Sequence, residues 1–501
     1  MPGMSTFYEV AAHDPGRVAV IDVDGHETTF GELSARANQL THALRALGLG
    51  EGGGVVAIIH NGLTYYELLL ATWQAGMYFT PVNHRSSPGE IAYIAANSGA
   101  KVAVADADIA VTCTAELWSL HRFSRGETPG WADYTAWGAD GPTTTPDQRT
   151  AGQTMLYTSG TTGRPKGVRR ALSGRPPALH PIHANVLERL DVRPGHGVHL
   201  VACPLYHAAP GMFSTAILHL GHTLVLMDRF DAEETLRLTE KHRVTSTHLV
   251  PTMFHRMLRL PADVRTRYDL SSLTSVIHGA APCPREIKER MLAWLGPVVH
   301  EYYGASEGLI TAVHARDWLA EPGTVGTPLD GVRVKVLDDD GAELPAGETG
   351  TLYFSSAHTK FDYHDDPGKT AAARSGEFVT VGDVGYLDAA GRVFLCDRRT
   401  DLILSGGVNI YPAEIEARLL GHPDVADVAV IGEPDPEWGQ RVVAVVQPVE
   451  GTAGDSALAK RLEEHCRAEL AGFKTPRRFD FRERLPRTES GKMLRRTLRA
   501  E

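Results

Sequence analysis

The sequence predicts an α/β protein: a large N-terminal domain of two α/β subdomains plus a β-rich subdomain, followed by a small α+β C-terminal domain. Its 501 residues are enough for about three domains. Up to residue 278, helical patterns alternate with short apolar strands, which favours parallel sheets covered by helices. Between residues 325 and 395 the pattern changes to short strands with turn signals, which indicates the β-rich part.

The first subdomain is predicted to contain a helix at 31–47, because apolar residues recur there at spacings of three and four. These residues are Leu33, Ala37, Leu40, Leu44 and Leu47. Buried strands are expected at 55–60 and 102–105, with a helix at 65–76 between them. Residues 124–150 are poor in aliphatic side chains and rich in Gly, Pro, Thr and Asp, so we expect a surface connection there.

The second subdomain resumes the alternation. Its predicted strands are 198–202, 223–226, 246–250 and 275–278, and its predicted helices are 213–220 and 232–242. The C-terminal unit is predicted to have helices at 412–420 and 456–470 and strands at 425–431 and 441–446. We therefore place the two domains at residues 1–397 and 402–501, joined by a hinge at 398–401.

The composition is typical of a soluble globular protein, with 43% hydrophobic and 22% charged residues. The net charge of -11 argues against a general nucleic-acid binder, because a phosphate backbone would be repelled. Residues 1–10 lack the pattern of a secretory signal, and the most apolar region, 65–79, is shorter than a membrane-spanning helix, so no integral membrane association is expected. The five scattered cysteines indicate no disulfide framework, and we expect a cytoplasmic protein.

A loop at residues 157–167 reads Tyr-Thr-Ser-Gly-Thr-Thr-Gly-Arg-Pro-Lys-Gly. Its glycines let backbone N–H groups point inward, while its hydroxyls and Lys166 add donors and charge, which suits a polyphosphate. Taken alone, such a loop is more often only a loop. It is not the P-loop of many nucleotide triphosphatases, because Lys166 is followed by Gly167 and not by a hydroxyl residue that could hold magnesium.

Five further segments follow this loop along the chain. They are Pro-Leu-Tyr-His at 204–207, Tyr-Gly-Ala-Ser-Glu-Gly at 303–308, Thr-Val-Gly-Asp-Val-Gly-Tyr at 380–386, the run 397–416, and Pro-Arg-Thr-Glu-Ser-Gly-Lys at 486–492. In this order the six segments resemble the motifs of the adenylate-forming superfamily, and the chain looks most like bacterial acyl-CoA synthetases and fatty acid–CoA ligases. The resemblance covers essentially the whole chain. It implies an AMP-forming ligase that activates a small acid with ATP, releases pyrophosphate, and passes the acyl group to coenzyme A.

The resemblance also implies which residues bind the nucleotide. They are Thr158, Ser159, Gly160, Thr161, Thr162, Gly163, Lys166, Gly279, Ala280, Ala281, Glu301, Tyr302, Tyr303, Gly304, Ser306, Asp383, Arg398 and Lys492. Tyr303 would stack on the adenine, and Asp383 would accept hydrogen bonds from the ribose hydroxyls. Outside these motifs, Tyr303 would be read as a core tyrosine, and Asp383 and Arg398 as surface residues.

The catalytic residues that the resemblance implies are Glu307, Lys492, His207 and Arg398. Charge accumulates on phosphate oxygens during the reaction, so Glu307 is the expected ligand of Mg²⁺. Lys492 would reach the reacting groups when the small, mobile domain closes, although a basic tail alone is more typical of a solvated surface. Thr400 stands at the expected hinge, where related sequences usually carry Lys or Asp. The 23 histidines show no ligand spacing of a zinc site.

The acid pocket is expected near Tyr206, His207, Met212, Ser214, Val250, Gly279 and Leu309. His207 could also be a packed core histidine. By the same resemblance, Gly406 and Gly407 would line a passage for the pantetheine thiol, which favours coenzyme A as the acceptor. The sequence leaves open whether the acid is aliphatic, aromatic or nitrite. It also leaves open transfer to a carrier protein or to an amine, as in a diazotase that couples adenylated nitrite to an aromatic amine, and whether the protein is a homodimer.

Overall fold

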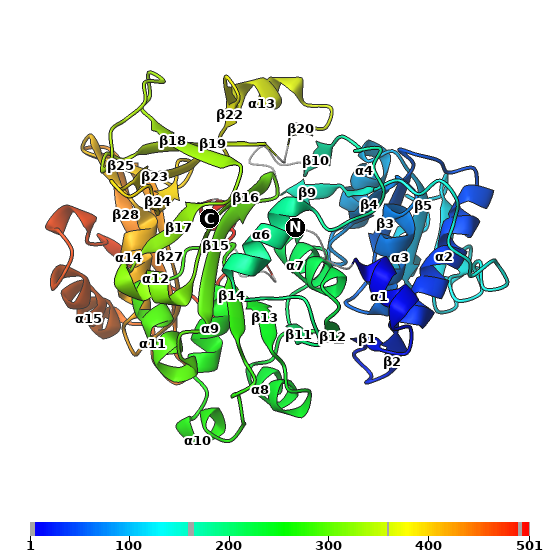
Figure 1. Cartoon of the computed structure of the whole chain (residues 1–501). Helices are drawn as coiled ribbons and strands as arrows, with labels where there is room; N and C mark the ends of the chain where they lie inside the picture. Colours follow the sequence, from blue (N-terminus) through cyan, green and yellow to red (C-terminus); the bar gives the residue numbers. More distant parts are fainter. Residues whose placement is uncertain (1–5, 159–164, 358–359, 489–492, 500–501) are drawn as a thin grey trace.

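The structure is a computed structural model, which describes residues 6–158, 165–357, 360–488 and 493–499. Two helix-covered sheets form most of the N-terminal part, and a smaller sheet forms the C-terminal part. In Figure 1 these parts follow one another from the blue right side, through the green centre, to the orange and red left side.

The first sheet has six parallel strands and forms the first predicted subdomain. In spatial order they are β7 (Ala132–Asp133), β6 (His121–Arg125), β5 (Ala100–Asp106), β3 (Gly54–Ile58), β4 (Tyr78–Pro81) and β8 (Gln153–Thr154). Helices α2 (Phe30–Ala46) and α3 (Leu63–Trp73) pack on one face, and α4 (Pro88–Asn97) and α5 (Ala107–Cys113) on the other. Because both faces are covered, β3 is apolar along its whole length.

Helix α2 shows how closely the sequence pattern fixes an element. Thr29 caps its first turn in a capping box with Glu32, which satisfies backbone N–H groups that have no partner inside the helix. The predicted apolar face is fully buried from Leu33 to Leu44, and only Leu47, just past the end of the helix, is half-buried. The helix predicted at 31–47 is therefore confirmed, with observed bounds Phe30–Ala46.

The second sheet is larger than predicted and has 15 strands. Its first part contains β2 (Glu27–Thr29), β1 (Val18–Ile21), β12 (Thr223–Leu226), β11 (Val198–Val201), β13 (Ser246–Leu249), β14 (Ser275–His278) and β15 (Val299–Ala305). It continues through β16 (Gly308–Val313), β17 (Thr324–Pro328), β24 (Val393–Arg398), β23 (Asp383–Leu387), β19 (Gly350–Ser356), β22 (Phe378–Val379) and β21 (Arg374–Ser375), with β18 (Val332–Leu337) beside β19. The β-rich segment is thus not a separate sheet, because β17 pairs with β24 and joins it to the α/β part.

Helices cover both faces of this sheet. One face packs against α6 (Pro181–Arg189) and α7 (Ala208–His219), and the other against α8 (Ala232–Lys241), α9 (Pro251–Leu258) and α11 (Arg285–Leu295). Helix α12 (Ala315–Ala320) shares the core of α8, α9 and α11, α1 (Phe7–His13) packs against α2 and α7, and the short helix α10 (Ala262–Arg265) follows α9. Helix α7 begins five residues before the predicted 213–220, because Pro210 is tolerated in a first turn whose N–H groups need no helical partner.

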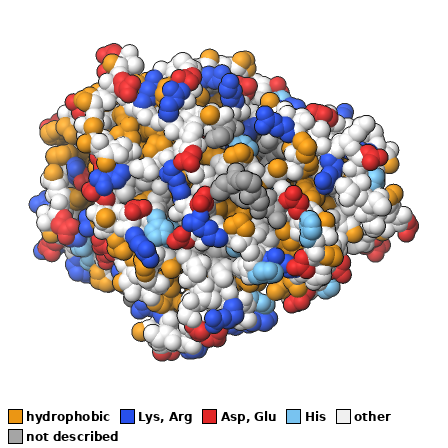
Figure 2. Space-filling model, in the orientation of Figure 1, with side chains coloured by type: hydrophobic (Ala, Val, Ile, Leu, Met, Phe, Trp, Pro, Cys, Tyr) orange, Lys and Arg blue, Asp and Glu red, His pale blue; other side chains and the backbone are white. Residues whose placement is uncertain are grey.

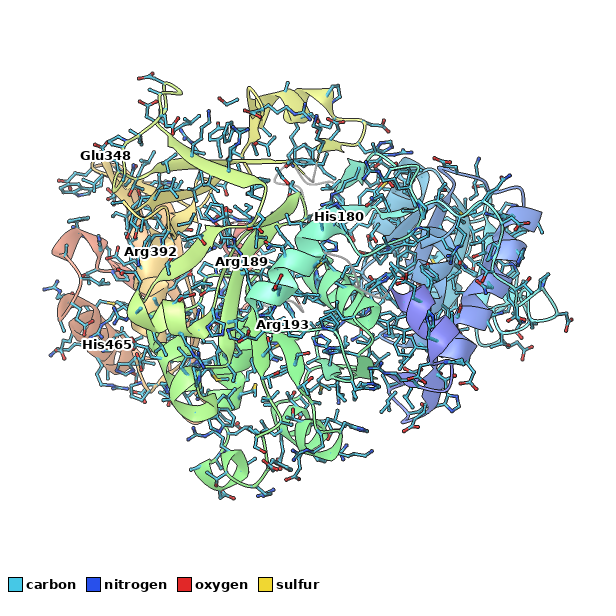
Figure 3. All side chains as sticks on the ribbon, viewed as in Figure 1. His180, Arg189, Arg193, Glu348, Arg392 and His465 are labelled. Carbon is cyan, nitrogen blue, oxygen red and sulfur yellow. The ribbon has the colours of Figure 1, made fainter. Side chains whose placement is uncertain are left out.

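Ion pairs fasten the helices to the sheet. Arg189 on α6, labelled in Figure 3, donates to the Pro328 carbonyl at 3.0 Å and pairs with Asp330 at 2.9 Å. Arg392, also labelled, lies just before β24 and pairs with Asp388, just after β23, and with Glu321, just after α12. The Arg189 contacts fix α6 relative to the β17–β18 connection, and the Arg392 contacts join the start of β24 to the segment after α12 and to the end of β23.

The remaining elements form a three-stranded sheet and the C-terminal domain. The small sheet contains β20 (Phe361–Tyr363), β10 (Lys166–Arg170) and β9 (Leu156–Thr158), and α13 (Pro367–Ala372) follows it. The C-terminal sheet contains β26 (Val408–Ile410), β25 (Ile403–Ser405), β28 (Gly439–Pro448), β27 (Val425–Asp435) and β29 (Arg478–Phe481). Its helical segments are α14 (Pro412–Leu420), α15 (Ser456–Arg467), the 3₁₀ turn Gly472–Lys474, and α16 (Arg495–Arg499).

The surface carries both signs of charge. On the face shown in Figure 2, Lys and Arg side chains are interspersed with Asp and Glu, and no extended patch of one sign stands out. Among the described residues, no helix has both the length and the apolar character that crossing a bilayer requires.

Candidate active site

Several predicted nucleotide-binding segments meet where β14 and β15 end. These strands are parallel, so their carboxyl ends lie at one edge of the sheet, where ligands of open α/β sheets usually bind. Residues 279–281 follow β14, and β15 turns back into β16 through Ser306 and Glu307. Ala280 has a φ of 65°, a left-handed conformation that non-glycine residues rarely adopt and that clusters at functional sites.

Glu307 lies in the tight turn between β15 and β16 and is only 6% exposed. Its Oε1 accepts a hydrogen bond of 2.7 Å from the hydroxyl of Tyr363 on β20. Arg170 on β10 donates to the Ser306 carbonyl at 2.6 Å, which braces the same turn. Burial lowers the pKa of Arg170, and the negative charge of Glu307 opposes that shift. The turn therefore presents a carboxylate held near a half-buried guanidinium.

Two lysines lie on the same side of the small sheet. Lys166 pairs with Asp366 at 2.5 Å, and this hydrogen bond lowers the pKa of the Asp366 carboxyl. The ammonium of Lys369 lies 3.7 Å from the ring centroid of Tyr363, and its pKa is lowered by burial and by Lys166. Positive groups thus surround the Glu307 turn, as phosphate oxygens would require.

Tyr303, Asp383 and Arg398 come together from three strands. The Tyr303 hydroxyl donates to Asp383 Oδ2 at 2.7 Å, and Arg398 Nε lies 3.2 Å from Asp383 Oδ1. Asp383 and Arg398 are directly opposite in the β23–β24 pair. Burial, followed by the charge of Asp383, raises the pKa of Tyr303 well above its ordinary value. The predicted nucleoside residues therefore form one contiguous group, with Arg398 at its exposed edge.

The structure directs two predicted nucleotide residues elsewhere. The carboxylate of Glu301 forms a buried ion pair of 2.5 Å with Lys288, whose ammonium lies over the Trp318 ring. The hydroxyl of Tyr302 lies 3.2 Å from His248 Nε2, inside the protein. Successive residues of a strand point to opposite faces, so the side chain of Tyr302 does not accompany that of Tyr303. The Glu301 carboxylate is instead held by Lys288 of α11.

The predicted acid-pocket residues are only partly brought together. Tyr206 and His207 are half-buried at the start of α7, with ring centroids 4.3 Å apart. Met212 and Leu309 pack in one hydrophobic core, whereas Val250 packs in the other, beneath α9. The Ser214 hydroxyl is fully buried and donates to the Pro210 carbonyl of its own helix at 2.7 Å, so it offers no hydrogen bond to a ligand.

Several predicted residues lie outside the described part of the chain. They are Ser159, Gly160, Thr161, Thr162, Gly163 and Lys492. Thr158 ends β9, where its backbone pairs with that of Lys166.

Residues of the predicted hinge and of the C-terminal domain are joined by arginine contacts. Thr400 is exposed between Arg399, which donates to Thr351 and Asp339, and Asp401, which pairs with Arg495 at 3.0 Å. Arg495 also binds both carboxylate oxygens of Glu416 at 2.7 and 2.8 Å. The segment around Arg495 is therefore tied directly to Asp401 of the predicted hinge.

Sequence reasoning missed the residues that support the site. Arg170, Tyr363 and Lys369 belong to none of the six motifs, and they reach Ser306 and Glu307 across 56 or more residues of chain. Asn61 was missed too. Its amide donates to the Cys203 and Met227 carbonyls and accepts from the Leu205 N–H, which holds the loop before Tyr206 and His207. Because these are long-range contacts, no local pattern marks them.

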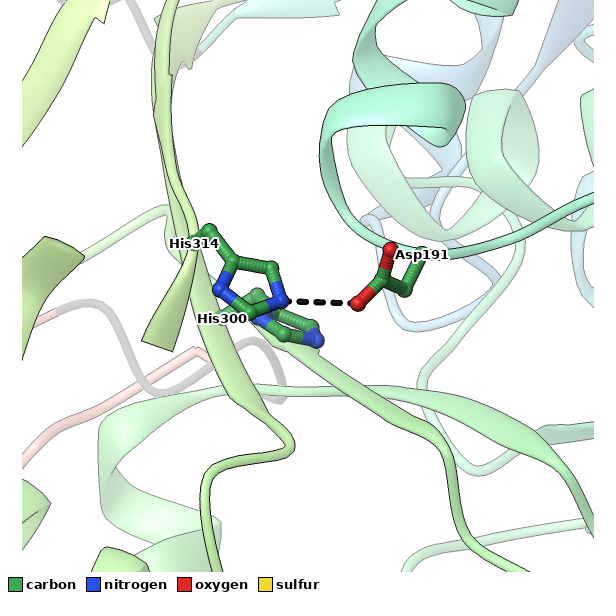
Figure 4. Close-up of side chains that lie close together, drawn as sticks. All are labelled: Asp191, His300 and His314. Carbon is green, nitrogen blue, oxygen red and sulfur yellow. Dashed lines mark hydrogen bonds and ion pairs between the residues drawn. The ribbon is translucent and has the colours of Figure 1, made fainter. Parts of the chain in front are cut away.

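A second group of polar side chains, Asp191, His300 and His314, has the spacing of metal ligands (Figure 4). The Nδ1 atoms of His300 and His314 accept the backbone N–H groups of Ala315 and Arg316, which leaves the ring protons on Nε2. His314 Nε2 then donates to Asp191 at 2.7 Å. A metal would need the lone pairs that these tautomers lack, so the group is a hydrogen-bond network between β15, β16 and the end of α6.

Comparison with known proteins agrees with this geometry. Residues 7–363 match the family model described as AMP-binding enzyme, and residues 414–492 match the model of the AMP-binding enzyme C-terminal domain. The chain therefore belongs to the AMP-binding enzymes, the adenylate-forming superfamily, and is an ATP-dependent, AMP-forming ligase.

Individual relatives are similar over nearly the full length. A feruloyl-CoA synthase of Amycolatopsis sp is 37% identical over 94% of this chain and 93% of its own. The fatty acid–[acyl-carrier-protein] ligase ScoC of Streptomyces coeruleorubidus is 33% identical over 98% and 94%. Among solved structures, ATP-bound MatB from Rhodopseudomonas palustris has a TM-score of 0.84 at 29% identity, covering 99% of this chain and 98% of its own. The amide bond synthetase McbA from Marinactinospora thermotolerans has a TM-score of 0.82 at 28% identity, covering 97% and 96%.

Proposed function

We propose that this enzyme is an acid–coenzyme A ligase that acts on a small organic acid. The observation that carries the proposal is the β15–β16 hairpin. Its first strand places Tyr303 beside Asp383 and Arg398, and its turn places Glu307 near positive groups. A nucleoside site and a phosphate site on one rigid hairpin suit a reaction at the α-phosphorus of ATP.

In the first half-reaction a carboxylate oxygen attacks the α-phosphorus. The bond from that phosphorus to its bridging oxygen breaks, and pyrophosphate leaves with the electron pair. Asp383 would hold the ribose hydroxyls, and Arg398 and the Lys166 and Lys369 ammonium groups would stabilise phosphate charge. Lys492 is proposed to donate to the reacting oxygens, as its motif implies.

Magnesium fits the Glu307 position. A carboxylate is a hard oxygen ligand, and in the described part of the chain the Tyr363 hydroxyl hydrogen-bonds to Oε1 and not to Oε2. Glu307 would hold the ion together with substrate phosphates. When bound, Mg²⁺ would neutralise part of the negative charge on the pyrophosphate leaving group.

In the second half-reaction the thiol sulfur of coenzyme A attacks the acyl carbon, AMP leaves, and the thiol proton is lost to solvent. The proposal rests on Gly406 and Gly407, which have φ values of 59° and 78°, in the left-handed region. The Trp438 ring lies directly against Gly406, and Leu404 and Val408 are exposed beside it. Two glycines beside apolar side chains suit the slender, uncharged pantetheine arm. The widely spaced free cysteines support a cytoplasmic enzyme.

A pyrophosphate-release screen over aliphatic acids, aromatic acids and nitrite, each with coenzyme A, with an aromatic amine, or with neither, tests the proposal. We expect acid-dependent pyrophosphate release, and an acyl-CoA product when the thiol is present. Glu307→Gln should lose this activity, while Glu343→Gln, at an exposed position of the same domain, should retain it. Turnover that ignores coenzyme A but requires an amine or a carrier protein would overturn the assignment of the acceptor.

A further inference from the structure

Three aromatic rings fill the interior between α7 and the sheet. Phe213 on α7 stacks on His248 of β13 with centroids 5.4 Å apart, and it meets Tyr302 of β15 edge-on at 4.9 Å. The Tyr302 hydroxyl is 3.2 Å from His248 Nε2. Phe213 is fully buried, His248 is 2% exposed and Tyr302 is 4% exposed. We call this group the aromatic plug.

The aromatic plug lies directly behind predicted acid-binding residues. A Cβ placed on Gly279 would lie 2.6 Å from Cε1 and 2.7 Å from Cζ of Tyr302, so the phenol ring is pressed against the backbone of that glycine. Met212 precedes Phe213 on α7 and is half-buried, and Leu309 packs in the same core as Tyr302. The plug therefore occupies the space that a longer acid would enter beyond Gly279.

The plug is held in place and is uncharged. Burial lowers the pKa of His248 to about 3, so its ring is neutral near pH 7 and forms an ordinary hydrogen bond with Tyr302. Swinging Tyr302 outward would break that bond and both ring contacts with Phe213 and His248. A second carboxylate or sulfonate placed against these rings would be desolvated without a cation from the plug to pair with it.

We infer that Tyr302, together with Phe213 and His248, closes the inner end of the acid site and restricts the substrate to acids with a short, uncharged body, such as a short aliphatic chain or a single ring. This inference rests on the proposed function. It excludes long fatty acyl chains and acids with a second charged group at the inner end. Tyr302 is the specificity-determining residue, because its ring lies directly against Gly279.

The test measures kcat/KM for pyrophosphate release with acetate, butanoate, octanoate, dodecanoate and benzoate in four proteins. In the wild type, short acids or benzoate should exceed octanoate and dodecanoate at least tenfold. Tyr302→Ala should raise the ratio of octanoate to butanoate at least tenfold, because the space behind Gly279 opens. Tyr302→Phe keeps the ring and should retain the wild-type profile. Phe254→Ala, which truncates a buried aromatic ring in the core beneath α9, should leave the ratio unchanged.

Two results would overturn the inference. One is a wild-type enzyme that prefers octanoate or dodecanoate, which requires no variant to fold. The other is a folded, active Tyr302→Ala enzyme with an unchanged chain-length profile. Failure of every acid to release pyrophosphate would instead contradict the proposed function, so the two failures are distinguishable.

Discussion

Replacing Tyr363 by Phe removes one oxygen atom and tests the arrangement of the Glu307 turn. In the structure this hydroxyl donates at 2.7 Å to a carboxylate that is 6% exposed. A hydrogen bond to a charged group contributes about 1.5–3 kcal/mol net, which corresponds to roughly 10- to 100-fold in an equilibrium or rate constant. If Tyr363 fixes the orientation in which Glu307 serves the metal and the phosphates, kcat/KM for ATP should fall by about that factor.

The assay is acid-dependent pyrophosphate release at several Mg²⁺ concentrations, with unfolding monitored in parallel. We expect Tyr363→Phe to need more Mg²⁺ for half-maximal rate while its KM for the acid stays close to that of the wild type. Tyr353→Phe, a half-buried tyrosine on β19, serves as the matched control and should behave as the wild type. An unchanged or lower Mg²⁺ requirement in Tyr363→Phe would refute the reasoning.

Three further predictions concern stability, the half-reactions and the acid loop. The buried His300 has a pKa of about 4, below its ordinary 6.5, so the unfolded chain takes up the proton first and stability is lost as pH falls from about 6.5 to 4. Its share is ~3 kcal/mol, and urea unfolding of His300→Gln should show a correspondingly shallower pH dependence; an identical dependence would contradict it. Lys492→Ala should slow acid-dependent pyrophosphate exchange by about 10²–10³ and spare thioester formation from a preformed adenylate, whereas equal loss of both would mean that the lysine is structural. Asn61→Leu removes two hydrogen bonds to the loop around Leu205 and one to Met227, and should raise KM for the acid by roughly tenfold with KM for ATP unchanged; a selective effect on ATP would argue against it.

Much of the fold could be predicted because its signals are local. The spacing of apolar residues and the Thr29–Glu32 capping box specify α2 without reference to the rest of the chain. The pairing of β1 with β12 could not be predicted, because the partners Val20 and Leu224 are 204 positions apart and neither strand encodes the other. For the same reason, the sequence does not predict the β17–β24 pairing, which merges the β-rich segment into the large sheet.

The candidate site, too, could be predicted only in part from the sequence. Tyr303, Asp383 and Arg398 were found through ordered motifs, and the structure brings their side chains into contact. The motifs did not indicate side-chain direction, so Glu301 and Tyr302 were grouped with Tyr303 although their side chains enter a buried ion pair and the aromatic plug. Strand alternation explains the direction of Tyr302 once β15 is known to be a strand, whereas the direction of Glu301 depends on its long-range partner Lys288.

The central claim is that the enzyme forms an adenylate on the acid itself, and an oxygen-labelling measurement tests it most directly. The best acid from the screen is prepared with ¹⁸O in its carboxylate and turned over with ATP, Mg²⁺ and coenzyme A. Transfer of the acyl group from an adenylate leaves one labelled oxygen on the phosphate of AMP, so mass spectrometry should find one ¹⁸O in AMP and none in pyrophosphate. Unlabelled AMP, or ¹⁸O recovered in a phosphate other than that of AMP, would contradict adenylation of the acid.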